Sequence, residues 1–166
     1  MISNRMISIK AGFLGGVWAT FVISAMMAMN NATHAIPELH LARTLSSILG
    51  VPDHAIVGWI AHFVIGTILF GIAFAVLAPR IPFRSNLVKG LAFGLLTWLG
   101  MMVIFMPLGG AGFFAATRGP IAPIAALVLN LVYGSVLGVV YGRESGPIKK
   151  VESANRKSPH QGDAIP

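Results

Sequence analysis

Residues 55–78 read AIVGWIAHFVIGTILFGIAFAVLA and contain no Asp, Glu, Lys or Arg. About 20 apolar residues in a helix span the roughly 30 Å hydrocarbon core of a bilayer, so this stretch is long enough to cross a membrane once. Its one ionisable side chain is His62. Polar groups at membrane depth are costly and usually have a partner or a task, so His62 is the first residue to explain.

The rest of the chain repeats this pattern three times. Apolar stretches predict further spans at about 11–30, 87–107 and 121–142. The chain is 55% hydrophobic and 10% charged, whereas soluble domains carry about 25% charged residues. We therefore predict an all-α fold, a polytopic membrane four-helix bundle, in which residues 1–142 form one transmembrane domain within the lipid bilayer.

The basic residues indicate the orientation. The formal net charge is +7, and all Lys and Arg except Arg43 and Arg118 form three clusters outside the spans: before the first span, between the second and third (Arg80, Arg84 and Lys89), and after the fourth. Cytoplasmic segments carry the Lys/Arg excess, so both termini are predicted to be cytoplasmic, with 143–166 a disordered basic tail. The charges are thus read as topology signals, with no nucleic-acid partner.

The first span also resembles a secretory signal, because Thr33, His34 and Ala35 follow it as a small-residue cleavage site would. Its apolar stretch, 11–29, is longer than the roughly 7–15 residues of a signal core. We expect it to be retained as a helix, with cleavage the alternative.

The outer connections are expected to be structured. Between Pro37 and Gly50, apolar residues recur at helical spacing and predict a short outer interfacial helix: Leu41, Leu45, Ile48 and Leu49. The connection 107–120 is rich in glycine yet apolar, so we expect it to pack onto the helix ends.

An internal repeat is a further hypothesis. The segment HFVIGT (62–67) aligns with NLVYGS (130–135), which pairs His62 with Asn130, Gly66 with Gly134, and Thr67 with Ser135. A duplicated two-helix hairpin explains this match, and chance agreement between glycine-rich apolar helices is the alternative.

Glycines at four-residue multiples predict close helix packing, because small residues let backbones approach where lipid supplies no hydrophobic drive. The candidates are Gly58, Gly66, Gly90, Gly94, Gly134 and Gly138. Packing within the bundle is the first reading, and a homodimer through the fourth span is the second.

Several roles remain open for His62. One role is a polar contact to Asn130, Thr97 or Thr67. The alternatives are an axial haem ligand, part of a polar path, and a contact to a quinone or lipid. Haem with two His ligands requires a second chain, because the other spans contain no His. The polar path of a channel or transporter would use His62, Thr67, Thr97, Asn130 and Ser135.

Catalytic and metal chemistry have little support. The outer segment holds His34, Glu38, His40, Asp53 and His54, but their spacing matches no metal signature, and the chain has no cysteine. No nucleophile–base set, carboxylate pair or phosphate loop is recognisable. We therefore predict no catalytic residues, no metal and no resident cofactor.

The segments GWIAHFVIG, KGLAFGLLTWLGMM, MPLGGAGFF and LVYGSVLG occur in this order over about residues 10–142. In this order they resemble a family of small uncharacterised four-helix bacterial inner-membrane proteins. The resemblance implies the fold and a bacterial inner membrane but no activity.

The leading functional hypothesis is a non-enzymatic structural or accessory component, on its own or within a larger membrane complex. The alternatives are a haem- or quinone-associated redox subunit using His62, and a small channel or transporter.

Overall fold

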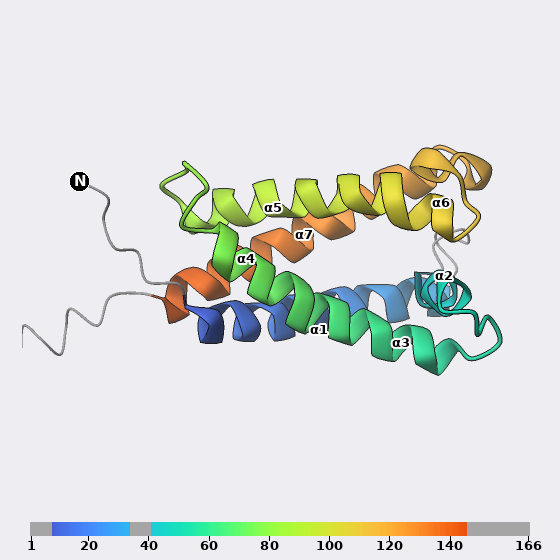
Figure 1. Cartoon of the computed structure of the whole chain (residues 1–166), viewed down its shortest axis with the longest axis horizontal. Coiled ribbons are helices and arrows are strands. Elements are labelled where there is room, and N and C mark those ends of the chain that lie inside the picture. The colour runs from blue at the N-terminus through green and yellow to red at the C-terminus, as the bar shows by residue number, and fades with distance from the viewer. Residues whose placement is uncertain (1–7, 34–40, 146–166) are drawn as a thin grey trace, which may run out of the picture.

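The computed structural model describes residues 8–33 and 41–145, and within them every regular element is helical (Figure 1). Two spans are interrupted by a π-helical segment, in which backbone bonds run from i to i+5. The four spans are α1 (Ile9–Thr33); α3 (Ala55–Val64), η1 (Ile65–Phe70) and α4 (Gly71–Leu77); α5 (Asn86–Gly100), η2 (Met101–Phe105) and α6 (Met106–Leu108); and α7 (Ile121–Glu144).

All four spans are long and apolar enough to cross a membrane, with mean hydropathies between 1.7 and 2.4. The predicted all-α membrane bundle is therefore confirmed. The helices extend slightly beyond the predicted spans: α1 begins at Ile9, and α7 continues to Glu144 into the segment predicted to be a tail. Residues 146–166 lie outside the described residues.

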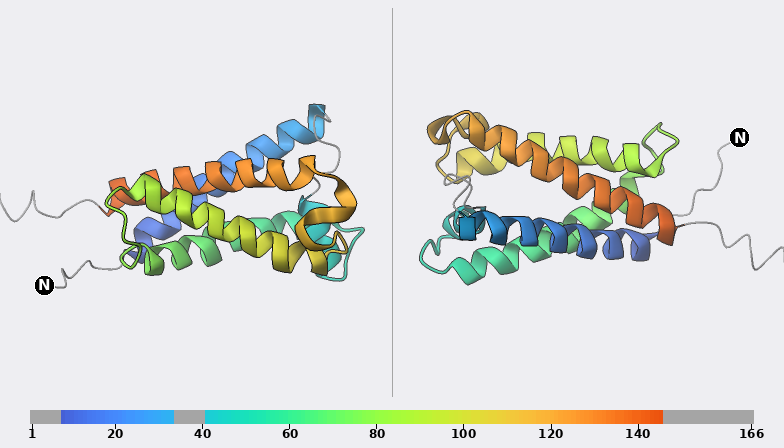
Figure 2. Two further views of the ribbon diagram at one scale, coloured as in Figure 1. Left: turned by 90° about the horizontal axis from the view of Figure 1, so that it is seen from above. Right: turned by 180° about the vertical axis from the view of Figure 1, so that it is seen from behind.

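The helices pack in the order second span, α1, α7, third span (Figures 1 and 2). Glycines determine both outer contacts. A side chain on Gly12 would overlap the carbonyl oxygen of Gly71, and one on Gly16 would overlap the backbone at Thr67. The α1 backbone therefore lies directly against the second span.

The contact between α5 and α7 is made in the same way. A side chain on Gly94 would overlap the carbonyl oxygen of Asn130, and Gly90, Gly134 and Gly138 lie against one another's backbones. These four glycines are thus used within the chain. The fourth-span stripe considered for a homodimer faces α5, and a homodimer stays a prediction.

The connection after α1 contains the helix α2 (Leu41–Ile48), while Pro37 lies outside the described residues. Of the apolar residues that predict this helix, Leu45 and Ile48 are half-buried. The buried side chains of α2 are Ala42, Thr44 and Ser46, and Leu49 is 55% exposed. Gly58 provides the reason, because it lets the backbone at Ala42 and the Ser46 hydroxyl lie against α3.

The second and third spans meet near the end that carries the 78–85 connection, called here the basic end. The rings of Phe74 and Phe93 lie 5.3 Å apart, and Lys89 Nζ donates a 2.7 Å hydrogen bond to the carbonyl oxygen of Ala78. Toward the α2 end the two spans separate (Figure 1). The close α1–α7 contact has no equivalent between them, so the packing departs from the twofold symmetry expected of a duplicated hairpin.

Lys89 differs from its sequence interpretation. It was grouped with Arg80 and Arg84 as a charge outside the spans, yet it is only 2% exposed. Its apolar stem packs along the helices while its ammonium reaches a carbonyl at the end of α4, where a cation is favourable.

The glycine-rich connection packs onto the helix ends, as expected. Ala111 and Ala115 are each 1% exposed, and a short 3₁₀ segment, η3 (Phe113–Arg118), lies between glycines of positive φ, Gly112 and Gly119. Only glycine adopts this conformation without steric cost, so these positions determine how the chain turns back toward α7.

We predict that Gly134→Leu destabilises the bundle. The new side chain would overlap the Gly90 carbonyl and force α5 and α7 apart, with a loss of about 1–3 kcal/mol in the free energy of unfolding, as for other overpacked cores. Denaturant unfolding of the protein in detergent measures this loss. Gly100→Leu is the matched control, because a Cβ at Gly100 has no atom within 4 Å. Equal stability of the two variants would contradict the packing described.

Candidate functional site

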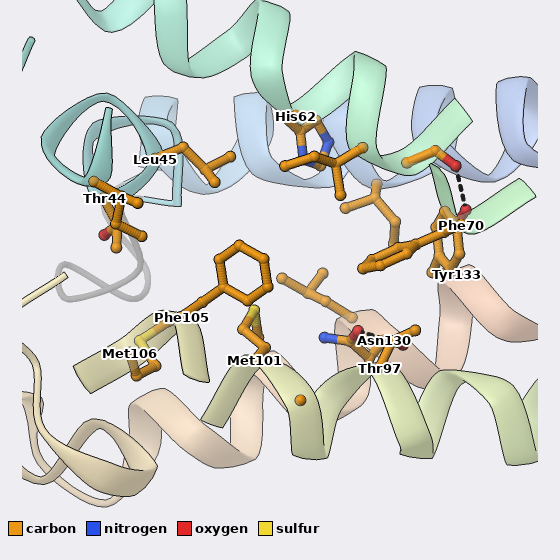
Figure 3. Close-up of a pocket in the computed structure, with 16 residues that line it drawn as sticks. Thr44, Leu45, His62, Phe70, Thr97, Met101, Phe105, Met106, Asn130 and Tyr133 are labelled. Carbon is orange, nitrogen blue, oxygen red and sulfur yellow. Dashed lines mark hydrogen bonds between the residues drawn. The ribbon is translucent and has the colours of Figure 1, made fainter. Parts of the chain in front are cut away.

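A cavity of about 190 Å³ lies where the second and third spans separate, and it is partly open (Figure 3). Its lining is almost entirely apolar, and residues from every span contribute. The residues are Ile23, Thr44, Leu45, Ile48, His62, Ile65, Gly66, Phe70, Thr97, Gly100, Met101, Phe105, Met106, Leu129, Asn130 and Tyr133.

The two ends of the cavity are closed differently. Toward the basic end, Phe70 and Tyr133 form a floor, with their rings 6.2 Å apart. The Tyr133 hydroxyl donates a 2.5 Å hydrogen bond to the carbonyl oxygen of Gly66 and thereby joins α7 to the second span. At the other end, Thr44 and Leu45 of α2 lie over the cavity. The interfacial segment is therefore part of the site.

Each of the two facing walls contains one of the π-helical segments. η1 contributes Ile65, Gly66 and Phe70, and η2 contributes Met101 and Phe105. A π-helical turn widens the helix and shifts the side chains that follow it, and such turns are frequent at functional sites. Here both deviations from α-helical geometry adjoin the same cavity.

His62 lies on the wall formed by the second span. Its ring is flanked by Trp59 and Phe63, each with a centroid 5.9 Å away and in an edge-to-face arrangement. Its Nε2 atom is buried and has no hydrogen-bond partner among the described residues. The expected bond to Thr67, Thr97 or Asn130 is therefore absent from the described structure. Such a buried polar atom requires an explanation.

Asn130 and Thr97 face His62 across the cavity (Figure 3). The Thr97 hydroxyl lies 3.0 Å from Asn130 Oδ1 and 2.9 Å from the carbonyl oxygen of Gly94, so one proton serves two acceptors. Asn130 Nδ2 donates to the carbonyl oxygen of Ala126 at 2.8 Å. The amide has two N–H groups, and these contacts use one of them. The other is available to a molecule in the cavity.

The five predicted polar residues do not form one path. His62, Thr97 and Asn130 line the cavity. Thr67 is absent from its lining and lies where its backbone packs against Gly16, and the Ser135 hydroxyl donates to the carbonyl oxygen of Leu131 at 2.7 Å. The predicted pairing of His62 with Asn130 thus corresponds to a shared cavity, although the two side chains do not bond to each other.

Sequence reasoning missed Tyr133 and the aromatic floor. A tyrosine in the middle of a membrane span was a usable signal, because a buried hydroxyl normally finds a hydrogen-bond partner. The contribution of α2 had no such signal, since the spacing of its apolar residues indicated only an interfacial helix.

Metal ligands are not brought together within the described residues, where no group of three or more His, Asp or Glu occurs. His34, Glu38 and His40 lie outside those residues. The absence of a metal site and of a haem therefore stays a prediction. The wall opposite His62 presents an amide and a hydroxyl, which suit an organic ligand.

We predict that Tyr133→Phe lowers the free energy of unfolding by about 1 kcal/mol, the typical net contribution of one hydrogen bond. The variant removes the bond to Gly66 while keeping the ring in the floor. Unfolding in detergent measures the effect. Tyr141→Phe on the same helix is the control, because no hydrogen bond of that hydroxyl is seen within residues 8–33 and 41–145. Equal losses in both variants would refute the assignment.

Comparison with known protein families finds a match to this chain. The model of a family of unknown function (DUF6789) matches residues 6–150, which include all four spans. No curated protein matches the chain, and no solved structure matches it.

Proposed function

Because the chain belongs to the family of unknown function DUF6789, we propose its function from the cavity itself. The protein is a non-enzymatic, multi-pass membrane component that binds a lipophilic small molecule between its second and third spans. The observation that carries this proposal is an apolar, partly open cavity lined in part by His62, whose buried Nε2 has no hydrogen-bond partner among the described residues.

The composition of the cavity supports small-molecule binding. Ligand sites are typically apolar with a few placed polar groups that fix orientation, and His62, Thr97 and Asn130 are such groups. The cavity lies between the second and third spans, which are both long and apolar enough to cross a membrane. A molecule dissolved in the bilayer therefore reaches the cavity laterally without crossing water.

The same chemistry favours binding over catalysis. The described part of the chain lines the cavity with one His, two Thr, one Asn and one Tyr, and with no acidic residue, Lys or Arg. A nucleophile with its base, or an acid–base pair, is not assembled from these groups. Holding a lipophilic molecule is consistent with an accessory role in a larger membrane complex.

The presence of a single imidazole in the described lining argues against the alternative of a haem-binding redox subunit. Haem held by two His residues would need its second ligand from another chain, because the opposite wall presents Asn130 and Thr97. A continuous polar path for transport is not supported by the positions of Thr67 and Ser135. We therefore prefer a small organic ligand.

For location, we propose the bacterial inner membrane with both termini in the cytoplasm. The support is the gathering of Arg80, Arg84 and Arg143 at the basic end, where α4 and α7 end, because Lys and Arg are enriched on the cytoplasmic side.

We predict that Gly100→Leu removes bound ligand without unfolding the protein. Gly100 lines the cavity, and a side chain there fills space instead of meeting protein atoms. Leucine also favours a helix over glycine by roughly 1 kcal/mol, so stability is expected to be kept or raised. Mass spectrometry of lipophilic extracts from protein purified from its own membranes measures the bound molecule.

The matched control is Val103→Leu, which adds bulk on the same span at a side chain that is 45% exposed and outside the cavity. Wild type and this control are expected to carry the same molecule in similar amounts. If Gly100→Leu retains that molecule, or if wild type carries none above a membrane-protein blank, the proposed function is wrong.

We also predict the orientation of the loops. The chain has no cysteine, so single-cysteine variants can be labelled without background. Arg84→Cys, in the basic connection, is expected to be protected from an impermeant maleimide in spheroplasts, and Phe113→Cys, 65% exposed near the α2 end, is expected to react. The opposite pattern would reverse the proposed topology.

A further inference from the structure

We infer that the ligand is a para-quinone or its quinol: one six-membered ring with an oxygen at each end, attached to a lipophilic tail. This inference rests on the proposed function and names the class of molecule that the cavity takes. It follows from three properties of the cavity: its size, the position of its polar atoms, and the residue types that it lacks.

The volume fits one substituted ring. A buried apolar cavity of about 150 Å³ accepts benzene, so the cavity of about 190 Å³ has room for a single ring with small substituents. A fused four-ring sterol body or a pair of acyl chains would have to remain largely outside. The tail of the ligand would lie in the partial opening between the second and third spans.

The polar atoms lie on opposite walls. Asn130 presents one remaining N–H, which can only donate, so the ligand atom beside it must be an acceptor. His62 Nε2 donates or accepts according to the tautomer, so a carbonyl or a hydroxyl satisfies it. A ring with an oxygen at both ends meets both requirements, and it does so in the oxidised and in the reduced form.

Thr97 is the positioning residue for this contact. Its hydroxyl lies 3.0 Å from Asn130 Oδ1, while Ala126 accepts from Nδ2. Together they define which amide atom is oxygen and which is nitrogen, because the reverse orientation would place Oδ1 against the Ala126 carbonyl. The donating edge of the amide is thereby kept toward the cavity (Figure 3).

The residue types exclude charged head groups. Among residues 8–33 and 41–145, no Lys or Arg lines the cavity to neutralise a phosphate, and no Asp or Glu lines it to neutralise an amine. An uncompensated charge at this depth is strongly unfavourable, whereas a quinone or quinol head is neutral. The rings of Phe70, Phe105 and Tyr133 and the thioethers of Met101 and Met106 provide contacts suited to a flat ring.

The test is direct binding of decyl-1,4-benzoquinone to the full chain in nanodiscs. Trp59, whose ring centroid lies 5.9 Å from that of His62, is a built-in reporter, since benzoquinones quench tryptophan fluorescence. We expect saturable quenching that is lost in Gly100→Leu and reduced in Trp59→Phe, where Trp98, next to Thr97 on the cavity wall, still reports binding. Decyl-p-xylene, which has methyl groups in place of both oxygens, is expected to compete at least about tenfold more weakly, because both hydrogen bonds are missing.

Variants of the two polar walls make the assignment specific. His62→Phe and Asn130→Leu are each expected to weaken quinone binding about three- to tenfold, the effect of one hydrogen bond. Thr67→Val, on the second span but outside the cavity lining, is expected to leave it unchanged. His62→Gln restores a hydrogen-bonding group and is expected to recover most of the affinity, which separates loss of the bond from loss of folding.

The outcomes separate this inference from the proposed function. Equal competition by decyl-p-xylene, or quinone binding unaffected by both His62→Phe and Asn130→Leu, would overturn the quinone assignment while leaving a general lipophilic site. Absence of saturable quinone binding, when Gly100→Leu still loses a co-purified molecule, would also overturn the quinone assignment alone. If the Gly100→Leu comparison reveals no bound molecule and quinone quenching is not saturable, both proposals fail.

Discussion

Direct contact between glycine backbones is the constraint on which the rest of this protein depends. Lipid offers no hydrophobic gain for bringing helices together, so association requires close packing. Glycines provide it where α1 meets the second span, as at Gly12 and Gly71, and where α5 meets α7, as at Gly90 and Gly134. These glycine contacts lie within each helix pair, and no such glycine contact joins the second and third spans within the described residues. The cavity occupies the space that results.

The sequence was sufficient to predict the four membrane helices, because an apolar stretch long enough to cross a bilayer has few alternatives to a helix. It also singled out His62, Thr97 and Asn130, since polar groups are rare in such spans, and the structure brings all three to one cavity. Their bonding was not predictable. Whether Thr97 forms a hydrogen bond with Asn130 or with His62 depends on how the helices are rotated and how far apart they lie. Hydrophobic periodicity and composition do not determine either quantity.

Other features were hidden for identifiable reasons. The π-helical turns at Ile65–Phe70 and Met101–Phe105 have no sequence signature, because they arise from how a span fits its neighbours. Lys89 resembled its exposed basic neighbours although its stem is buried. The burial of the polar Ser46 on α2 had no sequence signal, because it depends on Gly58, which lets this side chain lie against α3.

The contact of Phe74, Phe93 and Lys89 with the end of α4 has a mechanical consequence. It joins the second and third spans directly at the basic end, whereas at the other end α2 connects them, with Thr44 against Gly109. The two spans therefore resemble the arms of tweezers whose pivot is at the basic end and whose tips are linked through α2. A contact that brings the second and third spans closer together at the α2 end narrows the cavity and slows the release of a bound molecule. Thermodynamic reciprocity then requires that an occupant alter the spread of the arms by the same coupling energy. A neighbouring membrane protein in contact with those arms would thus sense whether the cavity is filled.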